Sequence, residues 1–230
     1  TLMYGLDLLR TASGKDPDGA AFLRTWMSEE KGHGDILRKF CAHLPNGDIA
    51  RYTKLDVIDA IANIPLKYAT ETFFQYMLAN LTGKLFIGLH MVWGATQELL
   101  TGVGYTNLRK LANHKILTTI IDDGIKPDEG RHAGSYLGKA IQHCGSSLTV
   151  RVIARVFFEL YFKPVGYGMG EEDEIRDMIN EILLHGDDAV ENLNTSVIEK
   201  LQKIPGFENC TKPRREILRM AREGAALVRI

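Results

Sequence analysis

The chain contains 230 residues, of which 45% are hydrophobic and 25% are charged, as is typical of globular proteins. Its 28 Lys and Arg residues nearly balance 29 Asp and Glu residues, giving a net charge of -1. This balance excludes a globally basic nucleic-acid-binding protein and an acidic disordered chain. The three cysteines lie far apart without a C-x-x-C motif, which predicts free thiols in a reducing compartment, so we expect a cytoplasmic protein.

We expect neither a secretory leader nor a membrane span. The first residues lack a basic start followed by a long apolar run. The most apolar stretch, residues 148–162, contains Arg151, Arg155 and Glu159. A span needs roughly 20 mostly uncharged apolar residues, so this stretch predicts a buried helix instead.

Apolar residues recur at three-to-four spacing along most of the chain, which predicts amphipathic helices. In chain order, the predicted helices cover residues 20–44, 55–64, 66–81, 85–112, 115–143, 148–162, 171–184, 188–204 and 212–227. No stretch shows the alternation of a convincing strand. Because the loops are short, neighbouring long helices should pack antiparallel in a bundle. We therefore expect an all-α protein with a single domain over residues 1–230.

Two copies of Glu-x-x-His lie on predicted helices, one at Glu30 and His33 and the other at Glu129 and His132. Residues at i and i+3 lie one turn apart on one helix face, so both side chains can reach the same metal ion. Two such pairs, with a Glu from each of two further helices, form the di-iron site of ferritin-like bundles. A single copy is more often a surface or capping pair. Two copies about a hundred residues apart favour a metal site.

A further carboxylate, Glu98, lies in an apolar part of the predicted helix at residues 85–112. Burying a carboxylate beside Leu99 and Leu100 without a partner is costly. Glu98 therefore faces solvent, pairs with an arginine, or supplies another ligand to the metal site. Carboxylate and imidazole ligands together suit iron or manganese.

Three residues should weaken or bend the helices that carry these motifs. Gly32 and Gly130 lie inside the two Glu-x-x-His motifs, and each costs on the order of 1 kcal/mol of helix stability relative to Ala. Pro127 lies just before the second motif and removes one backbone donor. We expect a kink or bulge near Pro127, and bulged helices often mark functional sites.

Three segments around these residues match the pattern of one protein family. Residues 24–35 read RTWMSEEKGHGD, residues 97–101 read QELLT, and residues 128–136 read DEGRHAGSY. They resemble the R-x-W-x-x-E-E-x-x-H-G-D, Q-E-x-x-T and D-E-x-R-H-x-x-x-Y segments of soluble acyl-(acyl carrier protein) desaturases, in the family's order. The resemblance covers most of the chain and is looser after residue 162. It implies a ferritin-like helical bundle with additional helices, whose first core helix, near residues 2–10, is truncated.

The resemblance also implies the ligands of two iron ions in each chain. These ligands are Glu30, His33, Glu98, Glu129 and His132. Glu30 and Glu129 would bridge the two ions, and Glu98 would be a terminal ligand. The family's sixth ligand, a Glu on the first core helix, would fall before Thr1. Two further matches are Thr101, near the oxygen site and thought to assist proton delivery, and Asp128, which would orient a ligand histidine.

The activity implied by the resemblance is an O2-dependent desaturation. The enzyme would introduce a double bond into an acyl chain carried on acyl carrier protein, with electrons from a ferredoxin-type donor. It would be a homodimer, in the plastid stroma if the source is a plant. Because acyl carrier protein is acidic, a basic docking patch is required. Its candidate residues are Arg38, Lys39, Lys212, Arg214, Arg215, Arg219 and Arg222.

Three alternatives remain open from the residues alone. One is a related di-iron oxygenase, a hydroxylase or N-oxygenase, acting on a carrier-bound or small substrate. Another is a ferritin-like iron-binding protein without catalysis. A helical scaffold that has lost its metal site is the third, and the missing sixth ligand motivates it.

Overall fold

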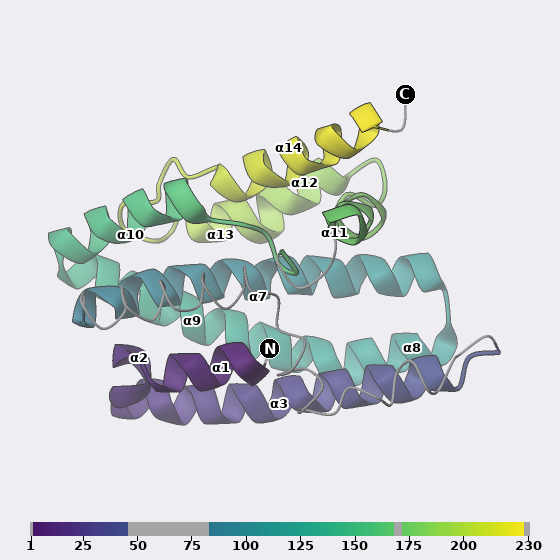
Figure 1. Ribbon diagram of the computed structural model, residues 1–230, viewed down its shortest axis with the longest axis horizontal. Helices are drawn as coiled ribbons and strands as arrows, with labels where there is room; N and C mark the ends of the chain where they lie inside the picture. Colours follow the sequence, from purple (N-terminus) through teal and green to yellow (C-terminus); the bar gives the residue numbers. More distant parts are fainter. Residues whose placement is uncertain (1, 46–82, 168–171, 228–230) are drawn as a thin grey trace. The chain divides into compact units, whose positions relative to one another are not determined.

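The computed structural model describes residues 2–45, 83–167 and 172–227 (Figure 1). Within these ranges the regular structure is helical and contains no strand, which confirms the predicted all-α class. The helices predicted at 55–64 and 66–81 lie outside the described residues. The chain divides into two compact units, residues 1–86 and 87–230. The expectation of one domain over residues 1–230 stays a prediction.

Over residues 2–45, the first unit contains two short helices and one long helix: α1 (Leu2–Leu9), α2 (Ala12–Lys15) and α3 (Pro17–Ala42). Helix α1 runs beside α3 (Figure 1), and a Cβ added at Gly5 would lie 2.5 Å from Cγ of Met27. Helix α3 begins three residues earlier than predicted. The reason is a local cap, because Asp16 accepts a hydrogen bond from the Gly19 amide at 2.8 Å and proline occupies the first helical turn.

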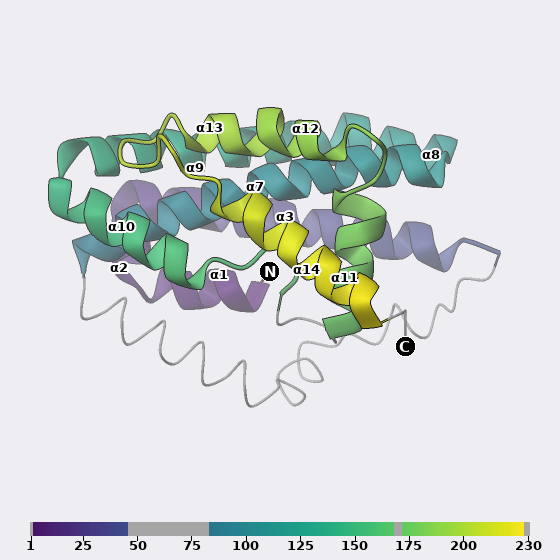
Figure 2. The same cartoon turned by 90° about the horizontal axis from the view of Figure 1, so that it is seen from above.

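The helices predicted beyond residue 84 are all present in the described residues, within a few residues of their predicted bounds. They are α7 (Lys84–Ala112), α8 (Lys115–Thr119), α9 (Lys126–Ser146), α10 (Leu148–Tyr161), α11 (Glu172–Met178), α12 (Ala189–Leu193), α13 (Glu199–Leu201) and α14 (Lys212–Leu227). Three π-helical segments continue these helices: η1 (Ile120–Ile125), η2 (Ile179–Leu183) and η3 (Asn194–Ile198). In the second unit, α14 packs against α11, η2 and η3 (Figure 2).

Helix α7 runs antiparallel to the continuous helix formed by α8, η1 and α9. His90, near the start of α7, stacks edge-on against Tyr136 of α9, with ring centroids 5.5 Å apart. Arg109, near the end of α7, binds Asp122 of η1 at 2.5 Å. Contacts that pair early residues of α7 with late residues of the other helix require opposite directions. The antiparallel packing predicted from the short loops is therefore confirmed for this pair.

The bulge predicted near Pro127 is confirmed by η1, which ends just before that residue. The amide of Lys126 donates to the carbonyl of Ile121, five residues earlier, which is the π-helical pattern. Pro127 has no amide hydrogen, so the regular α-helical ladder cannot continue through it. The wider turn precedes the turn of α9 that carries Glu129.

A small residue is required where α7 meets Tyr136. A Cβ added at Gly94 would lie 2.4 Å from the Tyr136 ring, whereas a Cβ at Gly102, on the same helix, would meet nothing within 4 Å. We expect Gly94→Ala to destabilise the protein by roughly 1–3 kcal/mol through overpacking. Gly102→Ala is the matched control, and it should stabilise the protein by up to about 1 kcal/mol. Urea unfolding of both variants measures the difference, and equal stabilities would contradict this packing.

Candidate metal centre

Helix α7 carries Glu98 in the interior of the second unit. Its neighbours Leu99 and Leu100 are buried, and Glu98 itself is only 7% exposed. The alternative in which Glu98 faces solvent is therefore wrong. One turn later, Thr101 is half-buried and its hydroxyl donates to the Gln97 carbonyl at 2.9 Å.

Helix α9 carries Glu129 and His132, one turn apart. Both side chains are buried, with exposures of 3% and 2%, while Gly130 and Arg131 between them are exposed. The i, i+3 spacing therefore puts the carboxylate and the imidazole on the inward face of α9, as predicted. Tyr136 continues this face one turn later and is also buried.

Helices α7 and α9 bring these side chains together. Oε2 of Glu98 lies 3.6 Å from Nδ1 of His132. Glu98, Glu129 and His132 each offer one ligand atom, and these atoms lie within 4.8 Å of one another. Two buried carboxylates at this separation repel each other when ionised, and a bound cation would offset that repulsion. The donor set, two hard carboxylate oxygens and one imidazole nitrogen, fits a metal such as iron or manganese.

The other Glu-x-x-His pair lies on α3, in the first unit. Oε1 of Glu30 is 3.5 Å from Nδ1 of His33, so the two side chains share one helix face as predicted. His33 is buried and Glu30 is half-buried. That this pair binds the same metal ions as Glu98, Glu129 and His132 stays a prediction.

Asp128 precedes Glu129 on α9 and is half-buried. Its carboxylate forms an ion pair with Arg131, one turn further along the helix. The roles implied for Asp128, orienting a histidine, and for Thr101, assisting proton delivery, both stay predictions.

Sequence reasoning missed a second buried histidine beside the cluster. His90 lies two turns before Glu98 on α7, and its Nε2 is 3.5 Å from the Tyr136 hydroxyl. Burial lowers the pKa of His90 to about 3, so its imidazole is neutral near pH 7. The sequence feature that could have indicated His90 is a histidine within the apolar stretch of the helix predicted at residues 85–112. Its neighbour became evident only from the packing of α7 on α9.

Four of the basic residues expected to dock acyl carrier protein lie on α14 and contact other residues of the second unit. Lys212 and Arg219 both pair with Glu216, and Arg215 pairs with Glu159. Arg214 donates a hydrogen bond to the Asn194 side chain at 2.8 Å. The carboxylates of Glu216 and Glu159 therefore offset part of the positive charge that the sequence alone indicated for α14.

No protein-family model, curated protein or solved structure matches this chain. None of the helices in the described ranges is long and apolar enough to cross a bilayer. The buried cluster of Glu98, Glu129 and His132 is therefore the feature that most directly indicates a function.

Proposed function

We propose that this protein is an O2-dependent di-iron desaturase that acts on an acyl chain carried by acyl carrier protein, with electrons from a ferredoxin-type donor. The observation that carries the proposal is the buried set of Glu98, Glu129 and His132, with ligand atoms within 4.8 Å of one another. Glu30 and His33 would complete the site from α3. A homodimer belongs to the same proposal.

The residues of the cluster suit this role chemically. Glu98 and Glu129 supply negative charge that favours divalent cations, and His132 supplies a nitrogen ligand. When bound, the iron ions would supply the O2 chemistry that removes hydrogen from an unactivated CH2–CH2 unit. The same metal ligands would serve a related oxygenase, so only the product distinguishes a desaturase from that oxygenase.

The remaining residues would hold the site in shape and keep water out. Leu99, Leu100 and Ala133, which are next to the ligands in the chain, are buried and contribute apolar side chains to the interior of the second unit. The Thr101 hydroxyl holds its proton on the Gln97 carbonyl, so its oxygen keeps a fixed direction beside the Glu98 turn. Fixed positions of this kind lower the entropic part of a reaction barrier.

Product analysis tests the proposal. The protein would be loaded anaerobically with Fe(II) and then supplied with reduced ferredoxin, O2 and an acyl chain on acyl carrier protein. We expect the acyl chain to lose two hydrogens, as mass spectrometry would detect. Glu129→Gln should be inactive, and Glu199→Gln, at an exposed position of α13, should retain activity.

Other products would favour other functions. Gain of one oxygen atom by the substrate would overturn desaturation and support the related oxygenase. Bound iron with unchanged substrate would support the iron-binding alternative. A chain that binds no iron would support the scaffold that has lost its site.

A further inference from the structure

Gln97 comes immediately before Glu98 on α7 and one turn before Thr101, and it forms hydrogen bonds at two points. Its side-chain Nε2 donates to the carbonyl of Lys163 at 2.9 Å, across 66 residues of sequence. Its own carbonyl accepts the hydrogen bond from Thr101 at 2.9 Å. Oε1 of Gln97 is buried and accepts no hydrogen bond from the described residues. The orientation of the side-chain amide therefore depends on the hydrogen bond from Nε2 to the Lys163 carbonyl.

The acceptor of this hydrogen bond is itself anchored. Phe162, the residue before Lys163, is fully buried and packs at a tilt against Trp93 of α7, with ring centroids 5.5 Å apart. Trp93 lies one turn before Gln97 on the same helix. The end of α10 is therefore held against the part of α7 that leads into the Glu98 turn.

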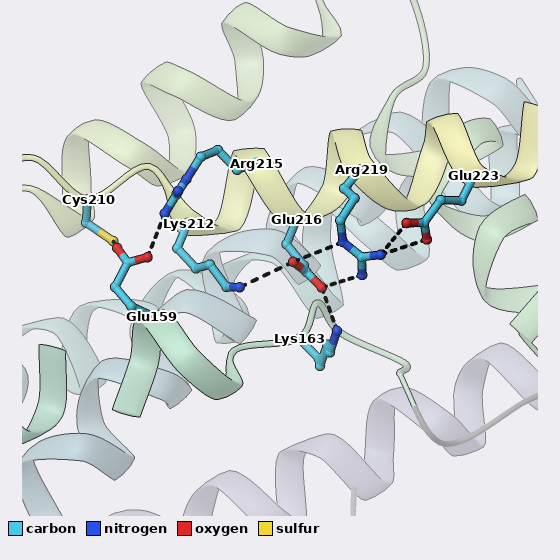
Figure 3. A network of polar contacts seen from close by, with 8 residues as sticks. All are labelled: Glu159, Lys163, Cys210, Lys212, Arg215, Glu216, Arg219 and Glu223. Atoms are coloured by element: carbon cyan, nitrogen blue, oxygen red, sulfur yellow. Dashed lines mark hydrogen bonds and ion pairs between the residues drawn. The ribbon is translucent and has the colours of Figure 1, made fainter. Parts of the chain in front are cut away.

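The Lys163 side chain connects the end of α10 to α14 (Figure 3). Its Nζ lies 2.6 Å from Oε1 of Glu216, which also pairs with Lys212 at 3.3 Å and Arg219 at 2.7 Å. The Glu216 side chain is only 7% exposed. A buried carboxylate that holds three cations gives Lys163 a fixed position rather than a choice of solvent-exposed rotamers.

We propose that Gln97 is a positioning residue for the metal centre: its amide, bound to the Lys163 carbonyl, holds the turn of α7 that carries Glu98 and Thr101. Glu216 of α14 holds Lys163, the residue that supplies the acceptor carbonyl, through an ion pair with the Lys163 side chain. In its effect on metal binding this inference rests on the proposed function. Outer residues that orient a ligand typically change metal affinity by about 10- to 100-fold when they are replaced.

A Gln97→Leu variant separates positioning from overall stability. The substitution keeps the size of the side chain and removes the buried Oε1, which lacks a donor among the described residues. It also removes the amide group that donates a hydrogen bond to the Lys163 carbonyl. These two changes oppose each other, so we expect a small change in global stability. Gln202→Leu is the matched control, because Gln202 is half-buried and also donates to a main-chain carbonyl, that of Cys210, at 3.4 Å.

The test is an anaerobic titration of the full chain with Co(II), followed by absorption spectroscopy. We expect Gln97→Leu to lower Co(II) affinity by about 10- to 100-fold and to change the spectrum, whereas Gln202→Leu should behave as wild type. Lys163→Met keeps the carbonyl and removes the ion pair with Glu216, so its loss of affinity should be smaller. In the double variant Gln97→Leu/Lys163→Met, the affinity should equal that of Gln97→Leu alone. The ion pair of Lys163 with Glu216 acts through the hydrogen bond of the Gln97 amide, and that bond is already absent in Gln97→Leu. A merely structural role would give additive losses.

Equal Co(II) affinities for Gln97→Leu and Gln202→Leu would overturn the inference. If the wild-type chain binds no metal, the proposed function fails, and hydrogen exchange of the metal-free protein then decides the inference alone. We expect amides 98–101 to exchange faster in Gln97→Leu than in wild type, with amides of α8 unchanged. Equal exchange at 98–101 would overturn the positioning role.

Discussion

Replacing His132 with alanine is expected to abolish tight binding of Fe(II) or Co(II). His132 is 2% exposed and lies 3.6 Å from Glu98, so its imidazole is the nitrogen donor of the buried cluster. Its loss should weaken binding by more than about 100-fold, beyond the effect of losing an outer-shell partner. Anaerobic titration against a competing chelator measures the affinity. His143→Ala, a half-buried histidine on the same helix, is the control and should bind metal as wild type does.

A Glu129→Gln variant tests whether loss of metal binding can occur without loss of the fold. The substitution preserves the shape of the side chain and removes one of two buried carboxylates that lie close together. We expect weaker metal binding together with an equal or higher free energy of unfolding for the metal-free protein, because like-charge repulsion falls. If His132→Ala and Glu129→Gln both retain wild-type affinity, the cluster is not a metal site.

Replacing Glu216 with glutamine is expected to lower the free energy of unfolding at pH 7 by on the order of 3 kcal/mol. Burial alone would raise the pKa of Glu216, but hydrogen bonds from Arg219 and Lys163, with the charges of Lys163 and Lys212, hold it at about 2 instead of 4.5. The variant leaves three cations around a neutral amide. Chemical denaturation measures the loss.

The same carboxylate predicts a pH dependence. Because the pKa of Glu216 is lower in the folded protein than in the unfolded chain, its contribution is fully present above about pH 4.5 and is lost as the pH falls towards 2. The variant should therefore lose stability less steeply over this range than wild type. Glu223→Gln, at an exposed position that pairs only with Arg219 in the described contacts, is the control and should change stability by at most about 1 kcal/mol. A Glu216 variant as stable as this control would contradict the prediction.

Local signals in the sequence predicted most of the helices in the described residues. Helix α14 begins and ends at the predicted residues, since a turn precedes Lys212 and the apolar spacing is regular through Leu227. Helix α3 begins earlier than predicted because the cap at Asp16 determines its start, and apolar spacing carries no information on a polar cap. The helix predicted at 188–204 is interrupted by η3, and a five-residue π segment leaves too small a change in apolar spacing to detect.

The candidate site was predictable only in part. The Glu-x-x-His spacing alone placed Glu129 and His132 on one face, because helix geometry determines that relation. The closeness of Glu98 to this pair depends on the packing of α7 against α9. Spacing within one helix carries no information on that packing. The contacts of Gln97 with Lys163 and of His90 with Tyr136 span 66 and 46 residues, and no local pattern marked them.

The number of iron ions that the chain binds tests most directly whether acidic and imidazole groups on its helices hold a pair of cations. The measurement is anaerobic loading with Fe(II), removal of loose metal, and X-ray absorption of the bound iron together with its stoichiometry. We predict two iron ions per chain and a metal–metal distance of about 3.5–4 Å, as in other two-metal sites. A chain that retains no iron, or a single iron without a neighbouring metal, would contradict a di-iron centre at Glu98, Glu129 and His132.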